Sequence, residues 1–200
     1  AELLTNDPTH VRFSPDGKLA IVGSTDNTAR IVDMADGHLV AELPTRGDAR
    51  SVDLAGDGRA LVISQTDAQI WLPDRAPIWR TRRLHPAADG IARVVISPDG
   101  ATFATVGGDG ALALHDRPTA VRRWRIGEDA VDAEFVDSSL LFAAFGRSVA
   151  LVDTTNGAIV ARQSPHFGQV VRVAASPDGT TLLSTEGSKL VTGKRRERTL

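Results

Sequence analysis

The sequence predicts an all-β fold in which a four-stranded antiparallel sheet is repeated about five times, and three observations support this prediction. A turn-forming tetrapeptide recurs along the chain, at Ser14–Gly17, Ala55–Gly58, Ser97–Gly100 and Ser176–Gly179. Short apolar segments rich in β-forming residues flank each copy, and no helical pattern separates them. Four-stranded sheets of about 40 residues, repeated radially, form a β-propeller.

The spacing of the tetrapeptide gives the length of the repeat. The first three copies lie 41 and 42 residues apart, whereas the last step spans 79 residues, which is about two repeats. We place the missing copy near Val136–Ser139, where apolar segments continue the pattern on both sides. Residues 1–200 then form a single domain with predicted blades at 8–44, 48–84, 90–126, 129–164 and 168–200.

The tetrapeptide has a mechanical role, which its first copy illustrates. Pro15 presets φ at the first central position of a turn, Asp16 can bond the nearby backbone, and Gly17 tolerates a positive φ. The segments His10–Ser14 and Leu19–Thr25 on either side are therefore expected to form a hairpin. Two further tight turns, at 26–27 and 36–37, complete the four strands of the unit.

The segment Val11–Gly17, followed by an apolar strand, a turn aspartate and an apolar-x-aspartate ending, resembles the WD repeats of bacterial proteins. The resemblance covers essentially the whole chain, but the repeats are degenerate. The Trp-Asp pair of the family corresponds here to Val32-Asp33, Trp71-Leu72, His115-Asp116 and Val152-Asp153. The family's turn aspartate corresponds to Asp26, Asp67 and Asp109, and its Gly-His pair to Pro165-His166. The hydrogen-bond network typical of the family is therefore expected to be incomplete in every blade.

The resemblance also implies a function. WD repeats commonly form non-catalytic scaffolds that present a rigid loop face to a protein or peptide partner. In bacteria they often follow a signalling or ATPase module, so we expect the sensor part of a larger regulatory protein. No cofactor is implied. Fold class does not determine function, and the partner's identity does not follow from the sequence.

The ends of the sequence leave two architectures open. Ala1–Thr5 is similar to Ala41–Thr45, the end of a fourth strand, and so could serve as a closing outer strand of the last blade. The chain would then be a closed five-bladed ring. The alternative, which we favour because five-bladed rings of this family are unusual, is a segment of a larger propeller, since four to eight blades are all physically possible.

Composition narrows the classes of partner. The net charge of -2 disfavours nucleic acid, although a local basic patch is compatible with it. No apolar run is long enough to span a bilayer, so we expect no membrane partner. The chain contains no cysteine, which excludes disulfides and thiolate metal sites and fits a reducing, cytoplasmic compartment.

Two basic, aromatic segments are the first candidate binding surface. They are predicted outer strands of neighbouring units and carry Arg80, Arg82, Arg123 and Arg125 beside Trp79 and Trp124. Arginine beside tryptophan suits acidic protein segments, phosphate or cation–π contacts. The alternative is that tryptophan turns inward while the arginines stay solvated and cover a sheet edge. We favour this alternative, since isolated arginines on a sheet surface need no explanation.

The second candidate surface is the ring of loops that join outer strands to inner strands. Its candidate contact residues are Arg46, His85, Arg147, His166 and Phe167. Phe167 is the best single hot-spot candidate, because aromatic residues dominate interface energetics. The alternative, which we favour, is that Phe167 packs between blades while His166 makes a structural hydrogen bond.

Motifs for catalysis are absent from the sequence, so we expect no enzyme. The five histidines stand in no metal-binding helix motif, and no Gly-x-Ser-x-Gly elbow occurs. The glycine-rich segment Gly107–Gly110 opens a strand rather than a helix, which excludes a phosphate loop. The alternative function is a propeller enzyme or small-ligand binder that uses the central channel.

Overall fold

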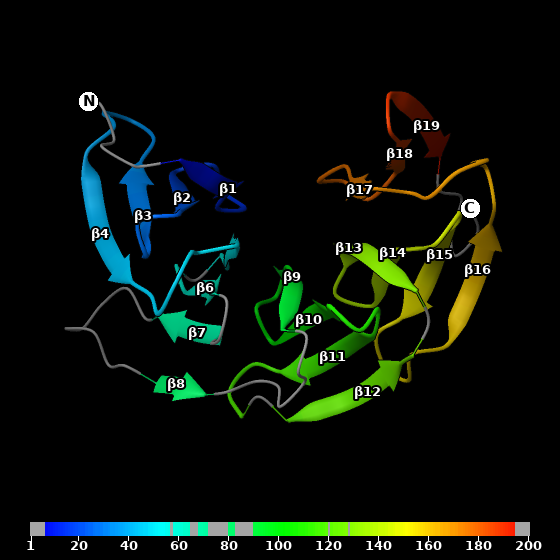
Figure 1. Ribbon diagram of the computed structural model, residues 1–200, viewed down its shortest axis with the longest axis horizontal. Helices are drawn as coiled ribbons and strands as arrows, with labels where there is room; N and C mark the ends of the chain where they lie inside the picture. Colours follow the sequence, from blue (N-terminus) through cyan, green and yellow to red (C-terminus); the bar gives the residue numbers. More distant parts are fainter. Residues whose placement is uncertain are drawn as a thin grey trace. The chain divides into compact units, whose positions relative to one another are not determined.

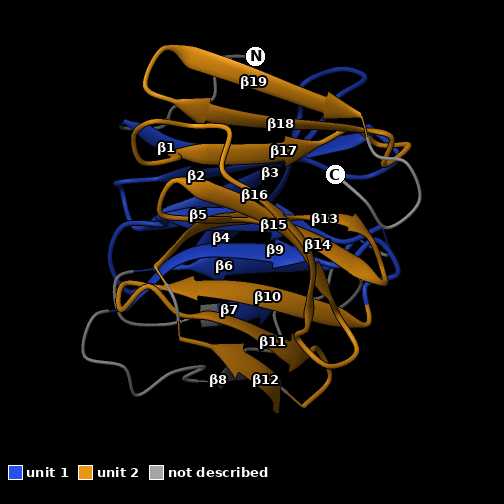
Figure 2. Ribbon diagram, turned by 90° about the vertical axis from the view of Figure 1, so that its right-hand side faces the viewer, with its two compact units in different colours: residues 1–100 blue, residues 101–200 orange. Residues whose placement is uncertain are grey.

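The computed structural model confirms an all-β fold built from antiparallel sheets (Figure 1). It describes residues 7–56, 58–64, 68–71, 80–82, 90–119, 121–127 and 129–194. Every regular element in the described part of the chain is a β-strand, and none of it forms a helix that could cross a membrane. The chain divides into two compact units, residues 1–100 and 101–200, which Figure 2 shows in two colours.

Unit 1 contains two complete four-stranded sheets and one further strand. The first sheet has the order β1-β2-β3-β4 and the second β5-β6-β7-β8. Their strands are β1 Pro8–Phe13, β2 Leu19–Ser24, β3 Thr28–Asp33, β4 Leu39–Pro44, β5 Ser51–Leu54, β6 Ala60–Ile63, β7 Ala68–Trp71 and β8 Arg80–Arg82. The last strand of the unit is β9, Ile91–Ile96, which belongs to the sheet ordered β12-β11-β10-β9.

Unit 2 holds the remaining strands of that sheet and two more sheets, ordered β13-β14-β15-β16 and β17-β18-β19. The strands are β10 Thr102–Gly107, β11 Leu112–Asp116, β12 Arg122–Ile126, β13 Ala130–Asp137, β14 Leu140–Phe145, β15 Ser148–Asp153, β16 Ile159–Gln163, β17 Arg172–Ala175, β18 Thr181–Glu186 and β19 Lys189–Lys194. Residues 164–171 form the connection from β16 to β17.

The recurring tetrapeptide forms the first hairpin turn of its sheets. In the first copy the Gly17 N–H donates to the Ser14 carbonyl at 2.9 Å, and the Ser14 hydroxyl donates to Asp16 Oδ1 at 2.7 Å. Gly17 has a φ of 70°, which favours glycine. The same bonds recur in the copies that begin at Ser97 and Ser176.

The repeat that lacks the tetrapeptide also forms a hairpin turn at the predicted position, near Val136–Ser139, but a different hydrogen bond stabilises that turn. Strands β13 and β14 are joined by Ser138-Ser139, and Asp137 Oδ1 accepts the Ser139 N–H at 2.8 Å. Asp137 also lies at a β-bulge. A side-chain oxygen that caps the backbone two residues on replaces the Pro-Asp-Gly turn.

The apolar cores lie between successive sheets, as expected for blades that pack face to face. In unit 1, Ile21, Ile31 and Leu43 of the first sheet pack against Val52, Val62 and other apolar residues of the second. In unit 2, Phe142 and Leu151 pack with Val173 and Leu182 of the last sheet. Burial of apolar side chains contributes roughly 25 cal/mol per Å², so these contacts are the main support of each unit.

Candidate partner-binding surface

One end of each sheet carries the turn between its second and third strands and the connection to the next sheet, and we call it the loop end. In unit 2 the loop end of the last two sheets includes the turn Gly146-Arg147 and the connection 164–171. Arg147, His166 and Phe167, three of the predicted contact residues, therefore lie together. Arg46 lies in the corresponding connection of unit 1, between β4 and β5, and is exposed.

Phe167 is 86% exposed, although its backbone is held on both sides. Its N–H donates to Glu186 Oε2 at 3.1 Å, and its carbonyl accepts a hydrogen bond from Arg147 Nη1 at 3.3 Å. The Lys189 ammonium lies 4.8 Å from the centre of its ring. Phe167 therefore does not pack between sheets, which the sequence analysis favoured; the ring stands in solvent on a fixed backbone.

His166 has the opposite environment, because its side chain is buried. Its Nε2 lies 2.7 Å from the Ser184 hydroxyl on β18, and its Nδ1 lies 3.3 Å from Glu186 Oε2. This is the structural hydrogen bond that the alternative interpretation expected. His166 therefore anchors the connection to the last sheet and fixes the backbone next to Phe167.

Glu186 and Lys189, which flank the last turn, are functional candidates that the sequence analysis missed. Glu186 comes so close to Gly168 that a Cβ there would overlap its carboxylate. A glycine directly after an exposed aromatic residue is the signal that could have indicated this close approach. The result is a positively charged rim, Arg147 and Lys189, around an apolar centre.

The basic strand β12 is largely paired within its own unit. Arg123 contacts Asp116 at 2.6 Å and Arg125 contacts Asp109 at 2.8 Å. Trp124 turns inward: its Nε1–H donates to the Thr154 carbonyl at 2.8 Å, and its ring lies against Gly157. Arg80 and Arg82 lie in strand β8 of the other unit, and His85, Asp67 and Trp79 lie outside the described residues.

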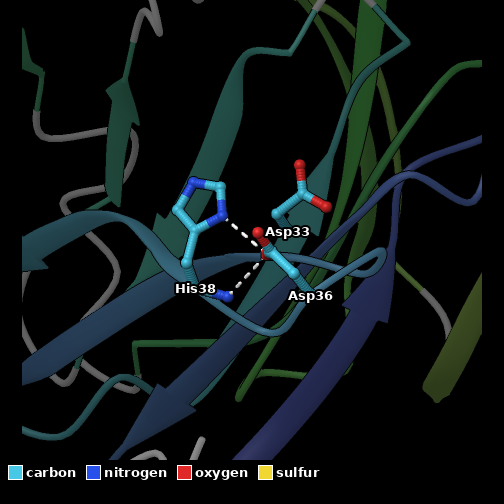
Figure 3. Close-up of side chains that lie close together, drawn as sticks. All are labelled: Asp33, Asp36 and His38. Atoms are coloured by element: carbon cyan, nitrogen blue, oxygen red, sulfur yellow. Dashed lines mark hydrogen bonds and ion pairs between the residues drawn. The ribbon is translucent and has the colours of Figure 1, made fainter.

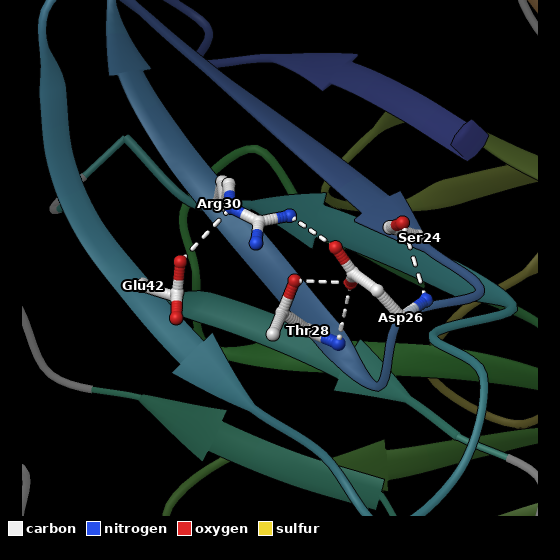
Figure 4. Close-up of polar contacts among 5 residues, drawn as sticks. All are labelled: Ser24, Asp26, Thr28, Arg30 and Glu42. Atoms are coloured by element: carbon white, nitrogen blue, oxygen red, sulfur yellow. Dashed lines mark hydrogen bonds and ion pairs between the residues drawn. The ribbon is translucent and has the colours of Figure 1, made fainter. Parts of the chain in front are cut away.

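The turn aspartate of the first sheet organises a charged network at the loop end of unit 1 (Figure 4). Asp26 accepts hydrogen bonds from the backbone and hydroxyl of Thr28 and from Arg30 Nη1, the last at 2.7 Å. Arg30 Nε also donates to Glu42 at 3.0 Å. Burial alone would raise the pKa of Asp26, but hydrogen bonds from Thr28 and Arg30 outweigh it and lower the pKa.

Aspartates on inner strands fasten successive sheets, which the sequence analysis did not predict. Asp53 Oδ2 accepts the N–H of Ile96 at 2.6 Å, and Asp132 Oδ2 accepts the N–H of Val173 at 3.0 Å. Each carboxylate also accepts the N–H of the residue that follows it. The same type of bond between successive sheets thus occurs in both units.

Asp33, Asp36 and His38 are close enough together to suggest a cation site (Figure 3). Asp36 Oδ1 lies 2.7 Å from His38 Nδ1 and accepts the His38 N–H at 3.0 Å. This contact raises the pKa of His38 and contributes to the lowered pKa of Asp36.

The equivalent turn of unit 2 explains the arrangement. There Asn156 accepts the Ala158 N–H at 2.8 Å without any charge cluster. In both turns an Asx side chain thus accepts the backbone N–H two residues on, and the grouping of Asp33, Asp36 and His38 follows from turn chemistry.

Comparisons with known proteins agree with this geometry. The family described as "WD domain, G-beta repeat" matches residues 5–33. The β-propeller domain of Cps50 (Swd1) from Myceliophteria thermophila matches with a TM-score of 0.82 and 18% identity, over 95% of this chain and 66% of that one. Hydrazine synthase from Kuenenia stuttgartiensis matches with a TM-score of 0.72 and 20% identity, over 92% of this chain and 57% of that one.

The chain thus spans less than two thirds of the length of both solved structures. At 18% and 20% identity, the similarity to these structures shows the fold alone. The family match at residues 5–33 shows in addition that this segment is a WD repeat. The chain therefore carries a WD repeat and has the fold of a WD-repeat β-propeller.

Proposed function

We propose that this chain is a non-catalytic scaffold that holds a protein or peptide partner at the loop end of unit 2, with Phe167 at the centre of the contact. WD-repeat propeller domains generally serve as protein-interaction scaffolds. For this chain we propose in addition where the partner binds and which chemical groups it carries. We also propose that this chain is the sensor part of a larger bacterial regulatory protein.

The observation that carries the proposal is the exposed Phe167 ring on a fixed backbone. An exposed aromatic side chain on a mobile loop would lose conformational entropy on binding. Here hydrogen bonds from Arg147 and to Glu186, together with the buried His166, hold the loop before any partner arrives. A preorganised aromatic residue is the typical anchor of an interface hot spot.

The charges around the ring favour a partner that carries acidic residues beside an apolar one. Arg147 and Lys189 are exposed and flank Phe167, whereas Glu186 is half-buried and already bonded to the loop. Opposite charge at the rim increases the association rate and fixes the register of a partner. Arg123 and Arg125, being ion-paired on β12, would contribute less.

A peptide-display selection against the purified chain tests this proposal. We expect selected peptides to combine an apolar side chain with aspartate or glutamate. The Phe167→Ala variant should bind them at least about tenfold more weakly, as expected for a hot spot. Arg147→Ala should weaken binding less and reduce its dependence on salt.

Val160→Ala is the matched control, because Val160 is an exposed apolar residue on β16, away from the loop end. Peptides that bind Phe167→Ala as tightly as the parent chain would refute the proposed centre. Failure to select any peptide that depends on the loop end of unit 2 would argue against the scaffold function there.

A further inference from the structure

The last sheet has a glycine at a core position where the other sheets carry a larger side chain. In the second sheet the cross-strand row Leu54–Ala60–Trp71 ends on a tryptophan of the third strand. The equivalent row of the last sheet, Ala175–Leu182–Gly193, ends on a glycine. By the same register, the equivalent residues of the remaining sheets are Val32, His115 and Val152. Each of these larger side chains is at most 5% exposed. Gly193 therefore leaves a core position unfilled.

A cavity of about 60 Å³ lies at this position, between the last sheet and the sheet β13–β16 of unit 2. A Cβ on Gly193 would meet no atom within 4 Å. The two sheets line the cavity with Leu182, Ser184, Gly193, Phe142, Val149 and Gln163. One water needs roughly 10–15 Å³ of such space, so the cavity holds a group several times larger than a water molecule.

The equivalent place in unit 1 shows which chemical group fills it. There the indole of Trp71 is buried in the core that also contains Leu43 and Val62. The strand register makes Gln163 the equivalent of Leu43, and Ser184 the equivalent of Val62.

The ring is therefore missing from unit 2 at a place where two apolar neighbours are replaced by polar ones. Loss of a core side chain does not by itself call for polar walls, which are costly to bury without a partner. A mainly apolar cavity with a few polar groups is the usual form of a small-molecule site.

Hydrogen bonds around the cavity determine which polar group it can bind. The Ser184 Oγ lies 2.7 Å from Nε2 of His166, whose Nδ1 lies 3.3 Å from Glu186 Oε2. The carboxylate holds the imidazole proton on Nδ1, so Nε2 accepts the proton of the Ser184 hydroxyl. The lone pairs of Ser184 Oγ then remain for a donor group in the cavity.

We infer that this cavity binds a small, uncharged aromatic molecule that carries an N–H donor. The ring occupies the space beside Gly193, and the N–H is directed at Ser184 Oγ. The apolar walls Phe142, Val149 and Leu182 disfavour a charged ligand, because a charge would lose its hydration there. The site lies between two sheets and does not depend on the partner contact proposed for Phe167.

Indole is the probe, because it is the ring of Trp71 without the chain. Calorimetric titration of the purified chain should give a Kd on the order of 1 mM, as expected for so small a ligand. NMR should show shifts of the backbone amides of Gly193 and Ser184. The ligand 1-methylindole, which lacks the N–H, should bind about fivefold more weakly or worse.

Gly193→Val tests the position, since valine is the residue of the first and fourth sheets there. It should weaken indole binding by about tenfold or more, because its side chain takes up the space of the ring. Gly193 has no positive φ, so the strand accepts the change. Valine also favours strands, so the loss of binding, rather than a rise in Tm, decides the test.

Thr185→Val is the matched control, because Thr185 on β18 pairs with Leu190 and lies on the opposite face of the sheet from Leu182 and Ser184. It should bind indole like the parent. A parent chain that does not bind indole would overturn the inference, as would a Gly193→Val variant that binds it equally well. Equal binding of indole and 1-methylindole would overturn the assignment of an N–H donor.

Discussion

The carboxylate of Asp132 accepts a hydrogen bond from the backbone N–H of Val173, so that the inner strand β13 is fastened to the inner strand β17 of the next sheet. Asp132 is fully buried and lies 41 residues from its partner. Asp53 makes the same bond to Ile96 in unit 1. A charged acceptor satisfies an N–H that would otherwise be buried without a partner at the edge of a sheet.

Asp132→Ala should lower the free energy of unfolding by about 1–3 kcal/mol, because it leaves the N–H groups of Val173 and Ala133 without their acceptor. Asp132→Asn keeps an acceptor oxygen and should cost less. Urea denaturation of both variants measures the difference. Glu134→Ala is the control on the same strand, where the side chain is half-exposed; an equal loss there would show that the effect is not specific to the inter-sheet bond.

The lowered pKa of Asp26 predicts a loss of stability in acid. Because the pKa of the folded state lies below the ordinary value of 3.8, the stabilisation is fully present above that value. It is lost as the pH falls through the lower, folded-state pKa. Asp26→Asn should therefore flatten the dependence of unfolding free energy on pH in this acidic range.

Asp178 provides the comparison for that measurement. A hydrogen bond from the Ser176 hydroxyl, with others from Thr180, lowers the pKa of Asp178 to about 2. Asp178→Asn should therefore also flatten the dependence of unfolding free energy on pH in the acidic range. Unfolding free energies of Asp26→Asn that follow the parent curve at every pH would contradict the proposed network of Thr28 and Arg30.

Local turn chemistry explains why so much of the fold could be predicted. Ser14, Asp16 and Gly17 determine a hairpin through bonds that span only a few residues, so the recurring motif indicates the strands around it. The contact of Asp132 with Val173 depends on β-bulges in β13 and on which sheet packs next to it. Neither is encoded in a local pattern.

The candidate surface was predictable to a similar extent. The loop position of Phe167 and Arg147 follows from the alternation of strands and turns. Whether the ring is buried depends on how the loop is held, here by Glu186, which lies at the end of strand β18, and by His166 of the same loop, which contacts that glutamate. Likewise the pairing of Arg125 on β12 with Asp109 in the turn between β10 and β11 depends on a strand register that the sequence does not show.

The turn from β3 to β4 predicts a specific titration of His38. Hydrogen bonding to Asp36, and the charge of that carboxylate, raise the pKa of His38 above 6.5. Asp36→Asn should return the pKa toward 6.5 and leave the fold intact, since Asn156 supports the equivalent turn of unit 2. NMR titration of the imidazole resonances measures this change. A strong loss of thermal stability in Asp36→Asn would show that the charge, rather than the Asx turn, holds the segment.

Gly157 and Gly146 allow the contact with Trp124 to be separated from backbone strain. Both have a positive φ, 76° and 55°, so replacement by alanine costs about 1 kcal/mol from the backbone at either site. A Cβ at Gly157 would in addition lie 2.9 Å from Cδ2 of Trp124, whereas one at Gly146 would meet nothing within 4 Å.

Gly157→Ala should therefore destabilise the chain more than Gly146→Ala, by a further 1–3 kcal/mol or so, as expected for overpacking. The displaced indole should also lose its hydrogen bond to Thr154 and change the tryptophan fluorescence. Gly146→Ala should leave the fluorescence of the folded state unaltered. Equal losses of stability in the two variants would mean that the ring moves aside without cost, and Trp124 would then contribute little to the packing of β12 on the following sheet.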